Sequence, residues 1–201
     1  MSRLNELLAQ GGMGPLSPEA DRQFSTYLEL LLKWNAKLNL TSVRSSDEIL
    51  QRHFVESIFC ARHLPKDVKT LLDFGSGGGF PGLPIAICSP GIAVTLSESQ
   101  GKKAAFLREA VRTLGLSASV HGGRAEELTQ CFEGITLRAV DKMVDAVSAA
   151  VDRLEIGGCM VLMIGANDTR SLGDPRLAWN DPIPIPGSQN RIVRMGRKRE
   201  P

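Results

Sequence analysis

The sequence predicts an α/β protein with a mostly parallel sheet and an N-terminal helical extension. An apolar run, Thr70–Phe74, is followed by a glycine-rich loop and an apolar segment, Leu83–Cys88, in the order of buried strand, loop and helix. Strand-like and helix-like segments then alternate as far as residue 164, which is typical of parallel sheets. Before residue 67, apolar residues instead recur at three- and four-residue spacing, which predicts helices.

The helical extension should contain three helices. Residues 1–10 form the first, and glycines and a proline end it. Ser17-Pro18 starts the second, because a capping side chain precedes a proline in the first turn, and its apolar positions continue to Leu38. The third starts at Ser46 and is stopped by Pro65. We expect residues 1–66 to form a helical cap packed on the core, and residues 67–201 to form the core domain.

The core should alternate strands and helices before ending in a less regular segment. Prolines at 175, 182, 184 and 186 argue against a long central strand there. We predict a loose hairpin instead, with residues 187–190 at its turn and Arg191–Met195 as its return strand. The expected core strands are Thr70–Phe74, Ile92–Leu96, Ala118–His121, Ile135–Val140 and Cys159–Ile164, and the expected helices are Leu83–Cys88, Gly101–Leu114 and Met143–Leu154.

The loop from residue 75 to residue 82, the glycine loop, carries glycine at five of its eight positions. Glycine allows positive φ and lets the backbone approach a ligand closely, and the following helix offers unpaired N–H groups. The loop therefore predicts a site for a polar small molecule at the carboxyl end of a strand. Gly77-x-Gly79-x-x-Gly82 also matches the dinucleotide fingerprint, so the loop alone leaves the ligand open.

Two carboxylates favour S-adenosylmethionine as that ligand. Asp73 ends the first strand, where it can meet the polar end of a ligand or fix the loop through backbone N–H groups. Glu98 ends the next strand, where an acid can accept both hydroxyls of a ribose. In the alternative interpretation, Asp73 only caps the loop and Glu98 is a solvated strand end.

The bulk properties exclude several classes of protein. The net charge of +2 neither requires nor excludes a polyanionic partner. The cysteines lie far apart and away from histidine, which argues against a zinc site and against a disulfide framework, so a reducing compartment is expected. No signal peptide and no run of about 18 apolar residues is found, so we expect a cytoplasmic protein. The cysteines are Cys60, Cys88, Cys131 and Cys159.

From residue 24 to residue 165 the chain resembles the bacterial 16S ribosomal RNA guanine-N7 methyltransferases, also called glucose-inhibited division protein B. The Trp-Asn-x-x-x-Asn-Leu-Thr-Ser run and the Gly-x-Pro-Gly-x-Pro end of the loop are not general methyltransferase features. The matching segments are Lys33-Trp34-Asn35, Asn39-Leu40-Thr41-Ser42-Val43-Arg44, Arg52-His53, Asp73-x-Gly75-x-Gly77-x-Gly79-Phe80-Pro81-Gly82-Leu83-Pro84, Gly101-Lys102-Lys103, Arg124-Ala125-Glu126-Glu127 and Arg138-Ala139.

This resemblance implies a Rossmann-like domain that uses S-adenosylmethionine to methylate N7 of a guanosine in the 530 loop of 16S rRNA, as naked RNA or in the 30S subunit. A monomer that needs neither a metal nor a membrane is expected, and no catalytic residue is singled out. Guanine N7 already has a lone pair, so alignment and electrostatics suffice. The expected cofactor-binding residues are Gly75, Ser76, Gly77, Phe80, Glu98, Ala125, Glu126 and Arg138.

Several positions depart from the family pattern. Glu98 stands where the family usually has aspartate, and Glu56 also replaces a common aspartate. Ile164 occupies the place of a lysine, which removes a cation near the expected RNA entry. Leu137 and Val140 replace a serine and an aromatic residue beside Arg138. A methyltransferase for another RNA or a small molecule, or a nucleotide-binding module without catalysis, are therefore kept as alternatives.

Basic residues are the candidates for RNA binding. Arg124 and Arg138 can contact phosphate or base edges, or instead pair with Glu126, Glu127 or Asp141. Residues 191–201, the basic chain end, are either an RNA contact or a solvated, frayed tail. His53 is either a buried, hydrogen-bonded side chain that orders the loop against the cap, or a catalytic group. The expected RNA-binding residues are Arg124, Arg197, Lys198 and Arg199.

Overall fold

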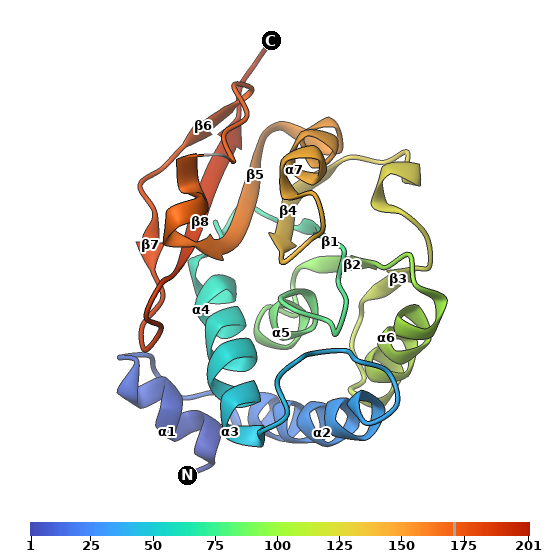
Figure 1. Cartoon of the computed structure of the whole chain (residues 1–201), viewed down its shortest axis with the longest axis vertical. Helices are drawn as coiled ribbons and strands as arrows, with labels where there is room; N and C mark the ends of the chain where they lie inside the picture. Colours follow the sequence, from blue (N-terminus) through green and yellow to red (C-terminus); the bar gives the residue numbers. More distant parts are fainter. Residues whose placement is uncertain (171) are drawn as a thin grey trace.

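The computed structural model describes residues 1–170 and 172–201, which form one sheet with helices on both of its faces (Figure 1). Across these residues the sheet has eight strands in the order β3-β2-β1-β4-β5-β8-β6, with β7 also paired to β8. The strands are β1 Thr70–Phe74, β2 Ala93–Ser97, β3 Ser119–His121, β4 Phe132–Arg138, β5 Leu154–Gly165, β6 Leu177–Trp179, β7 Ile183–Pro184 and β8 Arg191–Lys198.

The first five strands are parallel, as the alternating sequence predicts. β1 lies in the middle, with Asp73 opposite Leu96 of β2 and Thr136 of β4. The carboxyl ends of these strands therefore meet at one edge of the sheet. The glycine loop, the turn after β2 and the segment after β4 all leave the sheet at that edge.

The helices agree with the predicted pattern in number and place, with one difference. The third cap helix runs without a break from residue 46 to residue 63, but its middle is a π-helical turn, η1. The helical elements are α1 Arg3–Gln10, α2 Pro18–Asn35, α3 Ser46–Ile49, η1 Leu50–Val55, α4 Glu56–His63, α5 Gly82–Cys88, α6 Gly101–Thr113, the 3-10 turn η2 Ala125–Glu127, α7 Met143–Asp152 and the 3-10 turn η3 Ala166–Arg170.

Two hydrophobic clusters cover the two faces of the sheet, because successive strand residues point to opposite sides. Leu71 and Met163 belong to the cluster that contains the cap helices with α5 and α6. Leu72 and Leu162 belong to the cluster that contains α7. Figure 1 shows α1, α2 and α3 gathered at one end of the molecule, beyond α5. One cluster thus runs from the cap into the core, and the boundary at residue 66 stays a prediction.

The end of the chain is a strand inside the sheet, so the alternative of a frayed tail is wrong for β8. The hairpin prediction is confirmed, since Ile183 pairs with Val193. The sequence did not reveal that β8 also pairs antiparallel with β5, with Arg191 opposite Gly165 and Arg197 opposite Cys159. The local sequence pattern does not determine which strand β8 pairs with, because this depends on contacts between residues far apart in the sequence.

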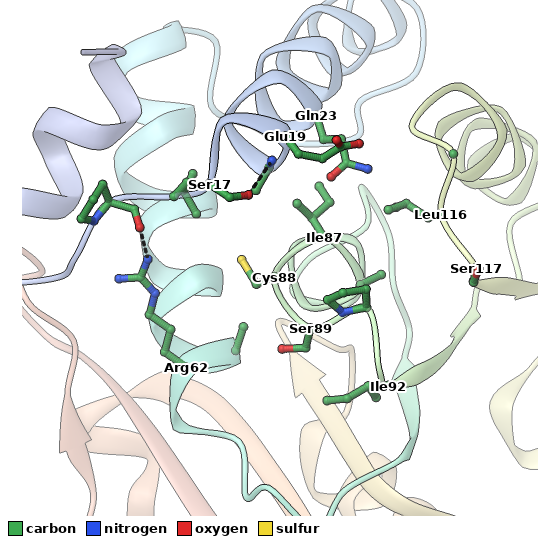
Figure 2. Close-up of a pocket in the computed structure, with 17 residues that line it drawn as sticks. Ser17, Glu19, Gln23, Arg62, Ile87, Cys88, Ser89, Ile92, Leu116 and Ser117 are labelled. Carbon is green, nitrogen blue, oxygen red and sulfur yellow. Dashed lines mark hydrogen bonds between the residues drawn. The ribbon is translucent and has the colours of Figure 1, made fainter.

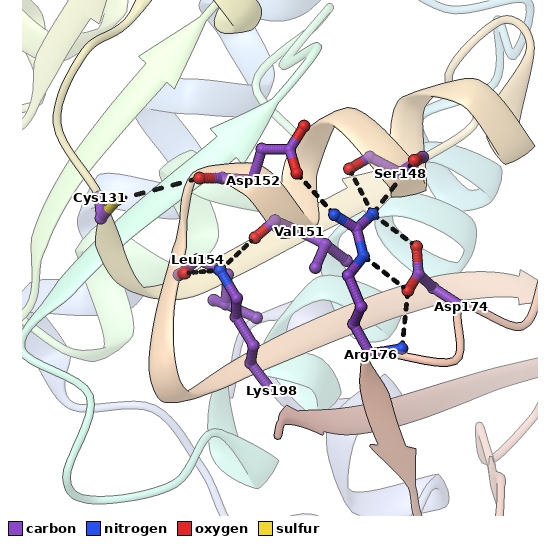
Figure 3. Close-up of polar contacts among 8 residues, drawn as sticks. All are labelled: Cys131, Ser148, Val151, Asp152, Leu154, Asp174, Arg176 and Lys198. Atoms are coloured by element: carbon purple, nitrogen blue, oxygen red, sulfur yellow. Dashed lines mark hydrogen bonds and ion pairs between the residues drawn. The ribbon is translucent and has the colours of Figure 1, made fainter. Parts of the chain in front are cut away.

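Polar contacts fasten this C-terminal part to α7 (Figure 3). The Lys198 ammonium donates to the carbonyl oxygens of Val151 and Leu154 at 2.8 and 2.6 Å, near the end of the helix. Arg176, just before β6, pairs with Asp152 at 2.6 Å and donates to the Ser148 carbonyl at 3.1 Å. The carboxyl end of α7 is therefore held by β8 and by the segment before β6.

Candidate active site

The glycine loop joins β1 to α5, and two of its glycines, Gly77 and Gly79, have different surroundings. Gly77 has φ of 54°, and the closest atom to a Cβ built there is the Gly75 carbonyl oxygen at 4.0 Å, so this position faces open space. Gly79 has φ of 95°, and a Cβ there would lie 2.8 Å from the Tyr27 hydroxyl and would overlap the Leu83 side chain. Gly79 thus permits packing, whereas Gly77 leaves room for a ligand.

Asp73 fixes the loop from beneath. Its carboxylate is fully buried and accepts hydrogen bonds from the Thr136 hydroxyl at 2.8 Å and from the Gly82 N–H at 3.2 Å. Burial raises the pKa of Asp73 to about 6, although the hydrogen bonds to Thr136 and Gly82 lower it. Of the two roles that the sequence left open for Asp73, the structure shows that it fastens the loop.

The cap holds the loop from the other side. The buried Tyr27 hydroxyl donates to the Gly78 carbonyl at 2.5 Å. The Phe80 ring stacks on the rings of Tyr27 and His53, with centroids 5.4 and 4.8 Å apart. Ser76 is also turned inward, and its hydroxyl donates to the Asp73 carbonyl at 3.0 Å. The loop is therefore held between the sheet and the cap by hydrogen bonds and ring contacts.

A cavity of about 630 Å³, the cofactor cavity, opens in front of the loop. Glu98 lines it, and its carboxylate accepts from the Gly77 N–H at 2.9 Å and from the Gln100 N–H at 2.7 Å. Because a carboxylate has about four acceptor positions, Glu98 can accept further hydrogen bonds from a ligand. The lining residues include Phe74, Gly75, Gly77, Ser97, Glu98, Gln100, Lys103, Gly123, Arg124, Ala125, Glu126, Ala139, Val140, Asp141, Lys142, Asp145 and Ala146.

The structure brings most of the expected cofactor residues to this cavity. It is lined by the five expected residues Gly75, Gly77, Glu98, Ala125 and Glu126. Ser76, Phe80 and Arg138 lie behind its wall, where they support the loop and the end of β4. The segment Ala139–Asp145 was missed. The rule that ligands bind beyond the carboxyl ends of parallel strands could have found it, since it follows β4 directly.

Arg138 has a different partner from those expected. Its guanidinium pairs with Glu56 of α4 at 2.8 Å and donates to the carbonyl of Arg52, so the interpretation that it pairs with Glu126, Glu127 or Asp141 is wrong. Burial lowers the pKa of Arg138 to about 10 while Glu56 raises it. The two side chains are 6% and 5% exposed, and the pair links the end of β4 to the cap. Arg124, at the cavity, does pair with Glu126 at 3.2 Å.

His53 is a neutral, mostly buried side chain in η1. Its Nε2 shares a 2.6 Å hydrogen bond with the Thr41 hydroxyl, and its ring stacks on Phe80. Burial lowers the pKa of His53 to about 3, and the nearby cations Arg138, Arg52 and Arg191 lower it further. His53 does not line the cofactor cavity, which supports the interpretation that it orders the loop against the cap.

A second cavity of about 620 Å³ lies between α2, α4 and the end of α5 (Figure 2). Ile92 and Ser117 line it, just before β2 and β3, so it lies at the amino ends of the parallel strands. The Arg62 guanidinium beside it already donates to the Pro15 carbonyl at 3.4 Å. Ligands of open α/β sheets bind at the opposite edge, and only the cofactor cavity has the glycine loop.

The basic chain end lies away from the cofactor cavity. Arg197 pairs with Asp67, which precedes β1, at 3.0 Å and donates to the Gly157 carbonyl at 2.8 Å. Both partners belong to the amino-terminal edge of the parallel strands. The RNA contacts of Arg197, Lys198 and Arg199 stay a prediction, as does that of Arg124.

In the part of the chain that is described, no group of three or more acidic, histidine or cysteine residues is placed to hold a metal ion. No helix among these residues has the length and apolar character to cross a membrane.

The fold and the glycine-loop cavity define a Rossmann-like methyltransferase. A family model described as rRNA small subunit methyltransferase G matches residues 20–178, and the chain belongs to that family. A ribosomal RNA small subunit methyltransferase G from Stenotrophomonas maltophilia is 38% identical over 168 residues, covering 80% of this chain and 78% of the relative. The enzyme of the same name from Chloroflexus aggregans is 34% identical over 195 residues, covering 89% and 82%.

Solved methyltransferase structures share the fold at low sequence identity. The O-methyltransferase from Bacillus cereus, in complex with SAH, has a TM-score of 0.61 at 17% identity, covering 86% of this chain and 91% of that one. The ribosomal protein L11 methylase from Lactobacillus delbrueckii has a TM-score of 0.62 at 10% identity, covering 75% and 80%. At such identities the likeness concerns the fold alone.

Proposed function

We propose that this methyltransferase transfers a methyl group from S-adenosylmethionine to N7 of a guanosine in the 530 loop of 16S rRNA. We propose that it acts in the cytoplasm as a monomer, on the naked rRNA or on the 30S subunit. The observation that carries the proposal is the cavity lined by Gly77 and Glu98, in a chain whose relatives are named for the small-subunit rRNA. Family membership supports the substrate, and the cavity supports the cofactor.

The residues around the cavity fit S-adenosylmethionine. The position beside Gly77 that a Cβ would fill is open, so a ligand can lie against the loop backbone. The carboxylate of Glu98 would accept the ribose hydroxyls, and Ala125 and Glu126 of η2 would border the adenine. Gly75 would meet the amino-acid end of the cofactor, beside the Phe80 side chain that fixes the loop.

The chemistry then requires little beyond alignment. When bound, the cofactor supplies a methyl group on a positively charged sulfur. Guanine N7 has a lone pair in the ring plane and loses no proton, so no general base is needed. The neutral His53 is behind the cavity, which agrees with a supporting role. The chain holds the loop and arranges charge around the two reactants.

The RNA is expected to contact exposed cations near the cavity. Arg124 is 69% exposed and pairs only with Glu126 among the described residues, so a phosphate could compete for its guanidinium. We retain Arg197, Lys198 and Arg199 as further candidate contacts, although two of them already have protein partners. An RNA that contacted both Arg124 and the basic chain end would have to extend from the carboxyl edge of the parallel strands to their amino edge.

The proposal is tested by mass mapping of 16S rRNA from cells with and without this gene. We expect one guanosine of the 530 loop to lose its methyl group in the deletion strain and to regain it when the wild-type gene is returned. A gene encoding Gly77→Val serves as the control, because it should restore the protein but not the methyl group. An unchanged 530 loop together with a methyl loss elsewhere would identify another RNA site. No change in the RNA would exclude the proposed substrate.

A further inference from the structure

A second, smaller hollow adjoins the cofactor cavity. It has a volume of about 310 Å³, and we call it the acceptor hollow. Lys142 and Asp145 line both spaces, so the two spaces meet at the start of α7. Ile164, near the end of β5, lies on its other side. The hollow is therefore at the carboxyl edge of the sheet, where the substrates of this fold bind.

Four of the residues that line the acceptor hollow are apolar, and the other three are Lys142, Asp145 and Asp168. Met143 and Val144 come from α7, and Ile164 and Leu172 are buried beneath them. Val144 is 58% exposed, an unusual position for a large aliphatic side chain unless something covers it. A flat aromatic ring system that enters from solvent would cover Val144, and the face of the ring would contact the apolar side chains of the hollow.

One acidic side chain stands where the two spaces meet. Asp145 is exposed, and no described residue forms a hydrogen bond or an ion pair with its carboxylate. Lys142, at the same junction, is exposed and has a flexible ammonium that can donate to a base oxygen such as guanine O6. The backbone that presents these side chains is unusual, since both Ala139 and Lys142 have positive φ, at 50° and 51°. The cost of such conformations is commonly tolerated at ligand sites.

We propose that the acceptor hollow takes the target guanine base, turned out of the RNA, and that Asp145 faces the purine as it becomes positively charged. This inference rests on the proposed function. Base-modifying enzymes commonly extrude their target and hold it between aromatic or apolar side chains. The apolar walls supply that contact here, and the junction directs the base toward the cofactor cavity.

Charge movement in the reaction explains the acidic residue. The N7 lone pair forms the new carbon–nitrogen bond, and the carbon–sulfur bond breaks with its electron pair remaining on sulfur. No proton moves, so the positive charge passes from sulfur to the purine. An exposed carboxylate beside the purine is therefore more stabilising in the transition state than before it.

Disulfide trapping tests where the base lies. Val144→Cys protein would be mixed with 30S subunits whose target guanosine carries a thioethyl group on N2 as a mixed disulfide. Ile156→Cys is the matched control, because Ile156 is 59% exposed but belongs to β5 and does not line the hollow. The parent protein controls for the exposed Cys131. We expect trapping of Val144→Cys to exceed both controls at least tenfold, and trapping no greater than the controls would overturn the proposal.

Single-turnover kinetics test the role of Asp145. At saturating S-adenosylmethionine, Asp145→Asn should slow methyl transfer at least tenfold, and a titration with S-adenosylhomocysteine measures any separate loss of cofactor affinity, since Asp145 also lines the cofactor cavity. Asp181→Asn removes the same charge from an exposed position that lines neither the hollow nor the cofactor cavity, and should slow transfer less than threefold. Equal rates for the two variants would remove Asp145 from the proposal. If wild-type protein does not methylate unmodified subunits at all, the proposed function itself fails.

Discussion

The hydroxyl of Tyr27 in α2 donates to the Gly78 carbonyl at 2.5 Å, so a cap helix holds the backbone of the glycine loop directly. Tyr27 is completely buried, and burial raises its pKa well above the ordinary value, which keeps the hydroxyl protonated as a donor. The cap thus contacts the glycine loop at Gly78, next to Gly77, which lines the cofactor cavity. The cap therefore supports the loop from behind as well as contributing to the hydrophobic core.

Tyr27→Phe should weaken both the fold and the cofactor site. The stacked ring contacts with Phe54 and Phe80 would remain, but the Gly78 carbonyl would lose its buried donor. An unsatisfied buried acceptor costs about 1–3 kcal/mol. We expect a loss of that size in the free energy of unfolding in urea, and weaker binding of S-adenosylhomocysteine by calorimetry. Unchanged stability and affinity would show that the cap does not support the loop.

Gly77→Val and Gly79→Ala should fail in different ways. The valine side chain introduced by Gly77→Val would project into the open space of the cofactor cavity and would be strained at φ of 54°, so this variant should fold with reduced stability and lose cofactor binding. Even the single methyl group of Gly79→Ala would overlap Leu83 and crowd the Tyr27 hydroxyl, so this variant should be strongly destabilised. Thermal melts and cofactor titration distinguish the two effects. A well-folded Gly77→Val protein with wild-type affinity would contradict the assignment of the cavity.

Glu98→Gln should lower cofactor affinity at least tenfold, because hydrogen bonds to charged groups contribute about 1.5–3 kcal/mol. Part of the loss could come from the loop, since Glu98 also accepts from the N–H groups of Gly77 and Gln100. A cofactor analogue that lacks the ribose 2′-hydroxyl separates the two causes. The wild-type protein should bind it more weakly than the parent cofactor, whereas the variant should discriminate little. If both proteins discriminated equally between the cofactor and the analogue, Glu98 would support the loop but would not bind the ribose 2′-hydroxyl.

His53→Gln should make the protein less sensitive to acid. The pKa of His53 is lowered to about 3, below its ordinary value of 6.5, so the unfolded chain binds a proton in this interval and the folded chain does not. The stability from neutral His53 is thus present above pH 6.5 and is lost as the pH falls toward 3. For each pH unit below 6.5, the free energy of unfolding of the wild type should fall by up to roughly 1.4 kcal/mol more than that of the variant. Urea titrations at about pH 7 and about pH 4.5 measure this difference. Equal losses of unfolding free energy in the wild type and the variant would show that His53 is protonated in the folded protein.

The sequence predicts the local framework of the site more fully than its long-range contacts. The expected strand Thr70–Phe74 coincides with β1, and the positions of the glycine loop and Glu98 at one cavity follow from their places beside strand ends. The spacing of glycines does not reveal that Gly77 faces a cavity and Gly79 a packed interface, because packing decides this. Arg138 likewise pairs with Glu56, which lies 82 residues earlier on the cap.

The acceptor side of the site illustrates the same limit. Ile164 is recognisable in the sequence as a departure from the family lysine, but only the structure shows that it forms part of an apolar hollow beside the cofactor cavity. β5 also starts at Leu154, five residues earlier than predicted, but its pairing with β4 is irregular between Leu154 and Cys159, where Gly157 has φ of 75°. Regular pairing with both β4 and β8 begins at Cys159, so the glycine pair does interrupt the strand locally.

The most direct test of the proposed function is to locate the methyl group that the purified protein adds to RNA. Undermodified 30S subunits and naked 16S rRNA would each be incubated with labelled S-adenosylmethionine, and the RNA would then be reduced and treated with aniline, which cleaves the chain at N7-methylguanosine. We predict labelling of at least one of the two substrates and a single new cleavage at a guanosine of the 530 loop. Label at another base or at another atom of guanine, or no label despite tight cofactor binding, would contradict the proposal.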